Sequence, residues 1–342
     1  MAVGQTCSVK GLPGGQKPDP VNIRESPPLL TRLCGAWLMI LWTGVSYGEA
    51  TGTAFDIALI SSDSPRHSTV VRAVQAKLAT PCSIAPCPPP ANVRQVKDTE
   101  ADRYLARTRP DLVITVGSAA AREVAELRKP IPTLFGFIPQ STWNDLKDCC
   151  ITSASTASHV LLDQPATRLL KLARALHPDA RTFGILLGPA SAKRLPEFET
   201  AAADLSLSLE TEQVAADEDI GRRLRLLVSR VDVLLALPDR AVYNSSTVYA
   251  VLLTTYSARV PVIGFSSALV RAGAAVGLFT SPQNGAEAIV SAVQAYRSTG
   301  VFLTDDASIP FSIEINKDVL RSLRLPVVQA NELLQLLKES TP

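Results

Sequence analysis

Aromatic residues are scarce in this chain: Phe, Trp and Tyr make up 5% of 342 residues, whereas all hydrophobic types together make up 46%. The core must therefore be mostly Ala, Val, Leu and Ile, which favours parallel strands covered by helices on both faces over an antiparallel sandwich. Net charge is also nearly absent, because 34 Lys and Arg face 32 Asp and Glu, for a balance of +2. Since no basic run is interleaved with aromatic residues, the sequence predicts no nucleic-acid partner.

A run long enough to span a bilayer, about 20 apolar residues, is also missing near the N-terminus. The apolar run at 33–45 is shorter; it follows Arg32 and precedes the small residues Gly48 and Ala50. This is the pattern of a secretory signal peptide. We therefore expect residues 1–50 to be an N-terminal tail and signal peptide, and the mature protein to be periplasmic. The alternative is a membrane anchor formed by an uncleaved segment 33–47.

Spacings typical of metal ligands are missing too. The three histidines are His67, His159 and His177. They show no regular spacing relative to the six cysteines, so no metal or other cofactor is predicted. Cys82 and Cys87 flank a short Pro-rich loop and could form a disulfide in an oxidising compartment. We expect Cys149 and Cys150 not to bond to each other, because a bond between adjacent cysteines is strained.

Catalytic motifs are absent as well. The sequence has no G-x-S-x-G elbow, no Walker loop and no H-E-x-x-H, and VGSAAA is too poor in Gly for a dinucleotide fingerprint. Asp239 and Arg240 could serve as an acid and its partner, although a surface ion pair at a strand end is the simpler interpretation. Serines lie at several predicted strand ends, but His67 is expected to be exposed within a helix and unable to activate them. We expect no enzyme.

The chain does contain two copies of one strand–turn–helix–strand unit. DLVITVGSAAAREVAELRKPIPTLFGF at 111–137 is matched by DVLLALPDRAVYNSSTVYAVLLTTYSARVPVIGF at 232–265. A strand and polar loop precede each copy, at 55–64 and 181–191. In parallel sheets, ligands bind beyond the carboxyl ends of the strands, near the N-termini of helices. The duplication therefore predicts two α/β lobes that clasp a small molecule.

Four further segments carry a family resemblance: LLDQPATRLLKLARALHPDARTFGILLGPAS, VDVLLALPDRAVYNSSTVYAV, VPVIGFSSALVRAGAAVGLFTSPQNGAEA and FSIEINKDVLRSLRLPV. Together with the two-lobe pattern over 54–330, they resemble ABC-transporter substrate-binding proteins of the tryptophan- and tyrosine-uptake type, which have a type I periplasmic-binding fold. The chain departs from that family at 138–160, where IPQSTWNDLKDCCITSASTASHV replaces a Ser-Asp-Pro turn and a Gly-rich segment. The ligand's identity is therefore not carried over.

The resemblance implies an α/β fold of two similar doubly wound parallel-sheet lobes joined by a three-strand hinge. Lobe one is expected to hold 54–160 plus 281–308, and lobe two 161–280 plus 309–342. The chain is expected to cross between the lobes near 161–163, 280–282 and 309–312.

The implied function is that of an exported solute-binding protein, a monomer that captures an amino acid or another small carboxylate or aromatic molecule for an ABC permease in the inner membrane. Two alternatives are a ligand-sensing or scaffold module of the same fold without transport, and a two-lobed transferase or hydrolase. Ser118 is expected to be the N-cap of a helix over 119–127 and to bind a ligand anion. The expected ligand-binding residues are Ser61, Ser62, Gly117, Ser118, Ala119, Phe137 and Gln140 in lobe one, and Asp239, Arg240, Tyr243, Ser266 and Ser267 in lobe two.

Overall fold

A computed structural model of the chain describes residues 55–80, 89–151, 156–215, 220–302 and 310–339. The expected signal peptide, the alternative anchor 33–47 and the loop with Cys82 and Cys87 lie outside the described residues. The described residues all belong to one compact unit. Within the described ranges, no helix combines the length and the apolar character needed to cross a membrane.

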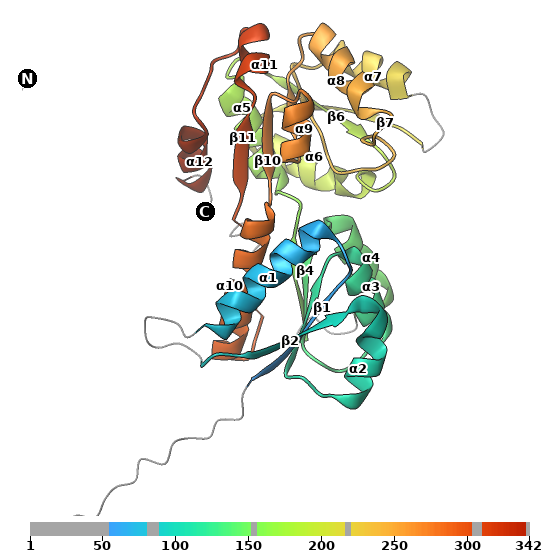
Figure 1. The fold of residues 1–342 in the computed structure, drawn as a ribbon. Helices are drawn as coiled ribbons and strands as arrows, with labels where there is room; N and C mark the ends of the chain where they lie inside the picture. The colour runs from blue at the N-terminus through green and yellow to red at the C-terminus, as the bar shows by residue number, and fades with distance from the viewer. Residues whose placement is uncertain (1–54, 81–88, 152–155, 216–219, 303–309, 340–342) are drawn as a thin grey trace, which may run out of the picture. The chain divides into compact units, whose positions relative to one another are not determined.

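The first sheet consists of five parallel strands (Figure 1). In chain order they are β1 (Asp56–Ser61), β2 (Asn92–Lys97), β3 (Leu112–Val116), β4 (Thr133–Ile138) and β5 (Ala157–Leu161). In space the order is β2-β1-β3-β4-β5. The connecting helices are α1 (Pro65–Ala79), the 3-10 turn η1 (Asp98–Glu100), α2 (Ala101–Arg107), α3 (Ser118–Glu126) and α4 (Gln140–Cys149). The central strand β3 is buried throughout and reads LVITV, as expected when both faces of a sheet are covered.

The second sheet has six strands in the spatial order β11-β10-β9-β8-β6-β7. They are β6 (Thr182–Leu187), β7 (Ser208–Gln213), β8 (Val233–Leu235), β9 (Val262–Gly264), β10 (Val276–Phe279) and β11 (Ser312–Ile315), of which β11 alone is antiparallel to its neighbour. Its helical elements are α5 (Ala166–Leu176), η2 (Ala192–Arg194), α6 (Leu195–Asp204), α7 (Ile220–Val228), α8 (Val248–Ser257), α9 (Ser267–Ala272), α11 (Lys317–Ser322) and α12 (Ala330–Glu339). The order β7-β6-β8-β9-β10 repeats the order of the first sheet, which agrees with the duplication seen in the sequence.

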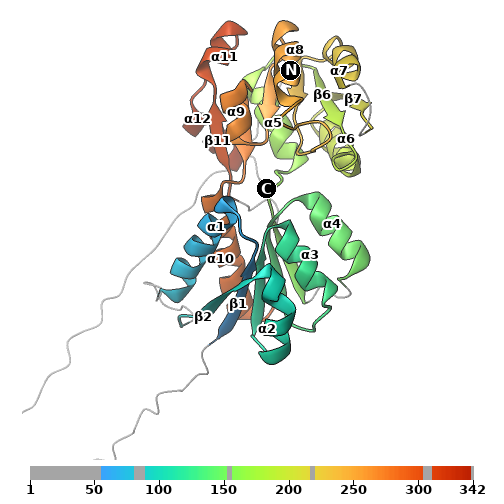
Figure 2. The ribbon, with the colours of Figure 1, turned by 45° about the vertical axis from the view of Figure 1, so that its right-hand side comes forward.

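Helix α10 (Pro282–Thr299) belongs to the first sheet, although in the sequence it follows five of the six strands of the second sheet. It packs alongside α1 (Figure 2). It begins with a capping box between Ser281 and Asn284. A Cβ atom on Gly136 of β4 would lie 2.6 Å from the side chain of Ile289 in α10. We call β1–β5 with α1–α4 and α10 lobe one, and β6–β11 with their helices lobe two.

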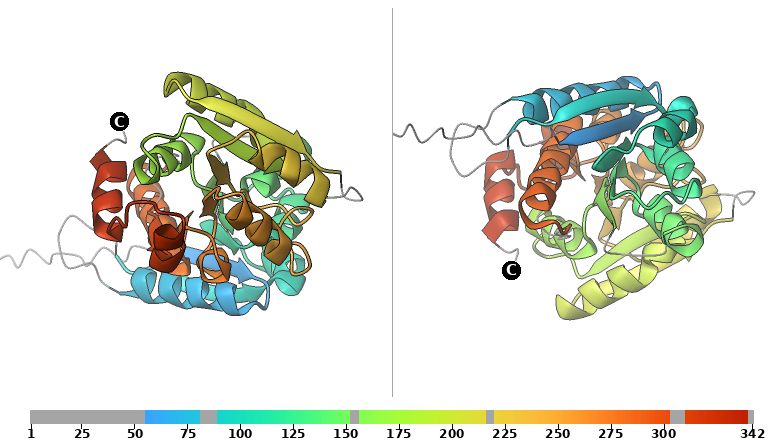
Figure 3. Two further views of the ribbon diagram at one scale, coloured as in Figure 1. Left: turned by 90° about the horizontal axis from the view of Figure 1, so that it is seen from above. Right: turned by 90° about the horizontal axis from the view of Figure 1, so that it is seen from below.

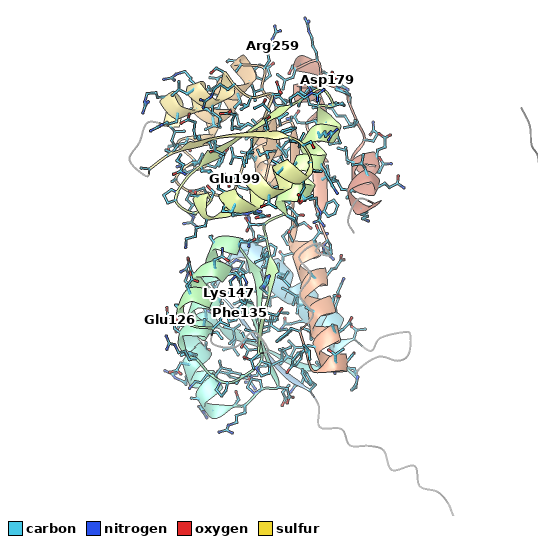
Figure 4. The ribbon with its side chains drawn as sticks, turned by 180° about the vertical axis from the view of Figure 1, so that it is seen from behind. Glu126, Phe135, Lys147, Asp179, Glu199 and Arg259 are labelled. Carbon is cyan, nitrogen blue, oxygen red and sulfur yellow. A yellow bond between two sulfur atoms is a disulfide. The ribbon has the colours of Figure 1, made fainter. Side chains whose placement is uncertain are left out.

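Each sheet has an apolar core on both faces, with helices on either side (Figure 3). In lobe one, α1 and α10 cover one face, while α2, α3 and α4 cover the other. Phe135 of β4 lies in the apolar core beneath α3 and α4, whereas Lys147 of α4 extends toward solvent (Figure 4). In lobe two, α5, α6 and α12 cover one face, and α7, α8 and α9 cover the other.

The expectation about Cys149 and Cys150 was wrong, because the structure joins them in a disulfide. Cys149 is the last residue of α4, and Cys150 leaves the helix with φ −138°. Because Cys150 lies outside the helix, the helical backbone does not set the direction of its side chain. The pair ends α4 next to Arg128, whose guanidinium donates a hydrogen bond to the Cys149 carbonyl at 3.0 Å.

Candidate functional site

The carboxyl ends of β1, β3 and β4 bring three loops of lobe one together. These strands are adjacent and parallel, so the residues that follow them lie at one edge of the sheet. The amide of Gly117, after β3, donates to the carbonyl of Gly136 in β4 at 3.0 Å. Ser61 is the buried last residue of β1, and Ser62 follows it in the loop.

His67 joins this edge, and the expectation that it would be exposed was wrong. The hydroxyl of Ser62 lies 2.9 Å from the His67 Nδ1 atom. Gly117 has φ +88°, and a Cβ atom on it would lie 2.3 Å from Cε1 and 2.5 Å from Nε2 of the His67 ring. Helix α1 starts at Pro65, directly after the loop, and side chains of a first helical turn lean back toward its N-terminus. His67 is therefore turned onto the β3–α3 turn and half-buried.

The surroundings of His67 favour the neutral form of its imidazole. Burial lowers the pKa of His67, and this effect outweighs the charge of Asp98 and the hydrogen bond with the backbone of Ser62, which both raise it. The nearby charge of Arg66 adds a smaller lowering of the same pKa.

The start of α3 also differs from expectation. Gly117 is the N-cap and Ser118 is the first helical residue, so no side chain caps this end. The Ser118 hydroxyl lies 3.0 Å from that of Thr142 on α4 instead. Ala119 is exposed. Because the first N–H groups of a helix have no partner within it, this turn can accept an anion.

Two further lobe-one residues of the predicted set have structural contacts. Phe137 is 5% exposed and has φ +57°. Its ring lies against Gly285 of α10, where a Cβ would be 2.4 Å from the ring, so Phe137 is part of the core beneath the edge. The amide of Gln140, the first residue of α4, donates to the Asp163 carboxylate at 2.7 Å.

In lobe two, Asp239 organises the loops rather than pairing with its neighbour. Its carboxylate accepts hydrogen bonds from the amides of Ala190 and Ser191 at 3.0 and 2.8 Å. It also accepts from the Ser191 hydroxyl and from the Ala241 amide, both at 2.9 Å. The expected surface ion pair is therefore wrong: Asp239 is buried and has no ion pair with Arg240 in the described part of the chain, and Arg240 is exposed.

The remaining lobe-two residues lie after β8 and β9. Tyr243 is 9% exposed, and its ring packs edge-on against Phe265 at 5.6 Å. Burial, assisted by the charge of Asp239, raises the pKa of Tyr243, and its hydroxyl has no hydrogen-bond partner in the described structure. Ser266 caps α9 by accepting from the Leu269 amide at 3.2 Å. The Ser267 hydroxyl accepts a hydrogen bond from Arg271.

A charged cluster at the first crossing between the lobes was not predicted. Arg194 and Asp163 are 3.2 Å apart, with side chains that are each 6% exposed. Arg194 also bonds Glu197 at 3.0 Å and the carbonyl of Gln164 at 2.9 Å. The cluster borders a cavity of about 330 Å³ that is lined by Gln140, Asn144, Leu161, Asp163, Pro165, Lys193, Arg194 and Glu197. Since Asp163 and Arg194 lie 31 residues apart, no local pattern in the sequence indicates that pair.

A second set of hydrogen bonds ties the first crossing to the next. The Gln164 side chain donates to the Thr280 hydroxyl at 2.8 Å and accepts from Arg168 at 2.7 Å. The Thr280 hydroxyl donates to the carbonyl of Leu162 at 3.1 Å. The Arg168 guanidinium lies 4.3 Å from the ring centre of Phe311, which leads into β11. Within the described ranges, no group of three or more His, Cys, Asp or Glu residues could hold a metal ion.

Solved structures show the same fold. An ABC domain in complex with L-Trp from Streptococcus pneumoniae is 18% identical, with a TM-score of 0.55, over 83% of this chain and 98% of that chain. A ligand-free, open substrate-binding protein with adhesive properties from Clostridium difficile is 16% identical, with a TM-score of 0.62, over 81% and 98% of the two chains. The predicted fold of two α/β lobes with parallel sheets, of the periplasmic-binding-protein type, is thereby confirmed.

A search of curated protein sequences gave no match. Residues 94–310, more than half of the chain, match the family model described as ABC transporter substrate binding protein. This match covers most of both sheets and the helix that returns to the first. The chain belongs to the ABC transporter substrate-binding protein family.

Proposed function

We propose that the protein is exported, captures a small molecule between its two lobes and delivers it to an ABC permease in the inner membrane. Family membership supports a binding role, and the pattern at 29–50 supports export. The observation that carries the proposal is the start of α3 at the carboxyl edge of the sheet, where no side chain caps the first amides and the His67 ring packs against Gly117. We propose that the protein works as a monomer, without a cofactor.

The predicted binding residues divide into two proposed roles. Contacts to the ligand would come from groups that lie at the two sheet edges and have polar atoms to offer. These are Ser61, Ser62, Gly117, Ser118, Ala119, Gln140, Arg240, Tyr243 and Ser267. Support of the loops would come from Phe137, whose ring lies in the core, and from Asp239 and Ser266, whose side chains bond backbone amides of the loops or of α9.

A thermal-shift screen tests this function. The L-Trp complex of the Streptococcus pneumoniae relative supports including aromatic amino acids, alongside other amino acids, nucleosides and small carboxylates. A ligand that binds the folded state raises the melting temperature in proportion to the logarithm of its concentration. We expect at least one amino acid or small carboxylate to do so. No shift with any compound at concentrations on the order of 10 mM would contradict the proposal.

The Ser62–His67 hydrogen bond favours one other candidate, a serine hydrolase. A catalytic pair needs a group that orients the histidine, and no described carboxylate bonds the second nitrogen of this ring. Asp98 acts on His67 through its charge alone. We therefore propose no enzymatic activity. Hydrolysis of p-nitrophenyl acetate by the wild type that Ser62→Ala abolished would establish the alternative.

Replacing Ser118 with Ala should weaken ligand binding at least tenfold and leave the fold intact. The loss of a hydrogen bond to a charged group corresponds to about 1.5–3 kcal/mol, or roughly ten- to a hundredfold in affinity. The internal bond with Thr142 contributes about 1 kcal/mol to stability. Calorimetric titration with the compound found by the screen gives the affinity.

Thr142→Val is the matched control, because it breaks the same internal bond from the other side. We expect a similar loss of stability and less than about a threefold change in affinity. Equal affinity losses in the two variants would mean that Ser118 acts through α4. Unchanged affinity in Ser118→Ala would place the anion elsewhere.

A further inference from the structure

Large hydrophobic side chains gather on the outer surface of lobe two. In the described structure seven such side chains are exposed, and four of them lie on the neighbouring helices α7 and α8 (Figure 1): Leu226, Tyr249, Leu253 and Tyr256. Tyr249 is the most exposed of the seven, at 73%. Single exposed hydrophobic residues are normal on a protein surface, whereas a patch of them indicates an interaction site.

Helix α8 carries no charged residue on any side. Its sequence is VYAVLLTTYS, and its buried side chains are Val251, Leu252 and Thr255. Tyr249, Leu253 and Tyr256 follow one another at i, i+4 and i+7, so they form one stripe along the exposed side of the helix. The outward side of a surface helix normally carries charged and polar residues. This stripe therefore favours contact with something less polar than water.

Two exposed arginines accompany this stripe. Arg225 lies on α7, whose sequence IGRRLRLLV contains no acidic residue, and Arg259 follows the end of α8 (Figure 4). Each helix connects two parallel strands of the second sheet, so the two helices run in the same direction. Arg225 and Arg259 therefore lie toward the same end of the pair. The acidic residues 217–219 precede α7, at the other end of that helix, and are not among the described residues.

The carboxylates of β7, which packs against α7, already have cationic partners. Glu212 pairs with Arg223 at 3.2 Å and with Arg230 at 2.7 Å, and Glu210 pairs with Arg230 at 3.7 Å. Asp232, which precedes β8, accepts hydrogen bonds from two backbone amides. Within the described ranges, no carboxylate forms an ion pair with either of the two exposed arginines. Their charge therefore remains for a partner of negative charge.

The α7–α8 face consists of Leu226, Tyr249, Leu253 and Tyr256, with Arg225 and Arg259. We propose that the α7–α8 face binds the surface of an anionic lipid bilayer. Tyrosine suits this role because its ring is apolar and its hydroxyl is polar, as at the level of lipid headgroups. The leucines reach the boundary of the acyl chains, and the arginines attract anionic headgroups. The inference goes beyond the proposed function, because it concerns the outer surface of lobe two.

A second copy of the chain fits the α7–α8 face less well. In a dimer with two-fold symmetry the same patch meets itself, so two faces that both carry positive charge would come together. Such contacts between like charges disfavour association. A bilayer that contains anionic lipids brings the opposite charge to the same face. The sign of the charge therefore favours the bilayer.

Vesicle sedimentation tests the proposal. The protein used starts at Thr51, because the run at 33–45 is apolar enough to bind lipid by itself; it keeps every described residue, all of which belong to one compact unit. The vesicles contain phosphatidylglycerol and phosphatidylcholine in equal parts, or phosphatidylcholine alone. An arginine near an anionic membrane strengthens binding about fivefold, so two predict on the order of 20-fold tighter binding to the anionic vesicles. About 0.5 M sodium chloride should remove most of this difference.

Two double variants locate the apolar contact. Tyr249→Ser with Leu253→Ser should weaken binding to the anionic vesicles at least tenfold, because it removes two apolar side chains from the bilayer boundary. Val327→Ser with Leu336→Ser is the matched control, since these exposed residues of lobe two lie outside the α7–α8 face. We expect both variants to fold, because all four side chains are exposed. The control should bind within about twofold of the wild type.

Arg225→Gln with Arg259→Gln tests the electrostatic part of the binding. We expect the preference for anionic vesicles to fall on the order of 20-fold, so that the variant binds both kinds of vesicle alike. Arg107→Gln with Arg109→Gln removes the same net charge from exposed positions of lobe one. That control should keep the preference within about twofold of the wild type.

A tryptophan probe reports whether the face enters the bilayer boundary. Tyr249→Trp places an indole on the α7–α8 face, while Trp143 of lobe one gives the same background in every variant. The emission of Tyr249→Trp should shift to shorter wavelength with anionic vesicles. Leu336→Trp, on α12, should show no shift.

Three outcomes would overturn the proposal. The first is equal or undetectable binding to the two kinds of vesicle, and the second is an equal loss of binding in the serine variant and its control. The third is a dimer, seen by light scattering, that Tyr249→Ser with Leu253→Ser converts to a monomer, because this would assign the face to a second copy. None of these outcomes concerns capture of a small molecule between the lobes, which the thermal-shift screen tests separately.

Discussion

Replacing Arg194 with Ala should lower the free energy of unfolding by about 3–5 kcal/mol, the usual effect of removing one partner of a buried ion pair. Arg194 and Asp163 are 3.2 Å apart, and each side chain is 6% exposed. Without the guanidinium, the Asp163 carboxylate stays buried, and among the described residues it keeps one hydrogen bond, from the Gln140 amide at 2.7 Å. The Gln164 carbonyl also loses its donor.

Urea unfolding followed by circular dichroism and by tryptophan fluorescence measures this loss. Trp143 of lobe one is the sole tryptophan outside the N-terminal tail, so fluorescence reports on that lobe while dichroism reports on both. Arg230→Ala is the matched control, because Arg230 bonds Glu212 at 2.7 Å but is 47% exposed. We expect that exposed pair to contribute about 1 kcal/mol or less. Equal losses in the two variants would show that the Arg194 cluster contributes no more than a surface pair.

Gly117→Ala should destabilise the protein by about 2–6 kcal/mol and disturb the candidate site as well. Gly117 has φ +88° and ψ 161°, a conformation that is nearly restricted to glycine and that strains other residues by about 1–3 kcal/mol. The new methyl group would also lie 2.3 Å from the His67 ring, and overpacking of this kind costs about 1–3 kcal/mol more. Ligand affinity should fall in parallel, because the ring must move away from α3. Denaturant unfolding and ligand titration measure the two effects.

Two further variants separate the backbone effect from the clash. Gly300 has φ +72° and open space around it, so Gly300→Ala should destabilise by about 1–2 kcal/mol through the backbone alone. Adding His67→Ala to Gly117→Ala removes the clash and should recover about 1–3 kcal/mol beyond the sum of the single effects. If Gly117→Ala were no worse than Gly300→Ala, or if the two changes were simply additive, the contact between Gly117 and His67 would be unimportant.

The sequence predicted the central strands of both sheets well, and it missed strands at their edges. Strands β3 and β8 are short apolar runs that each follow an Asp, because a central parallel strand is buried on both faces. Strands β2 (NVRQVK) and β7 (SLETEQ) lie at the edges and are partly exposed, so polar residues dominate them. Nothing in such a segment distinguishes a strand from a loop until its partner is known.

The sequence predicted which strand ends form the candidate site, but it did not predict the contacts between their side chains. The strand ends identified Gly117 and Ser118, because each follows an apolar run and precedes a helix. Which of the two caps α3 depends on the φ of Gly117, which residue spacing does not reveal. His67 was missed because its contact with Gly117 spans 50 residues of sequence and depends on how α1 meets the sheet. Arg194 and Asp163 were missed for the same reason.

The return of α10 to lobe one has a consequence for how the chain matures. Ala286, Ile289, Val290 and Val293 belong to the core that α1 forms on the first sheet. That core cannot close until the chain has been synthesised as far as α10, after nearly all of the second sheet. Contacts so distant in sequence form slowly, because a long loop must close first. The core of lobe one is therefore expected to close late, after most of the second sheet has been synthesised, which agrees with the export proposed above if the chain crosses the membrane unfolded.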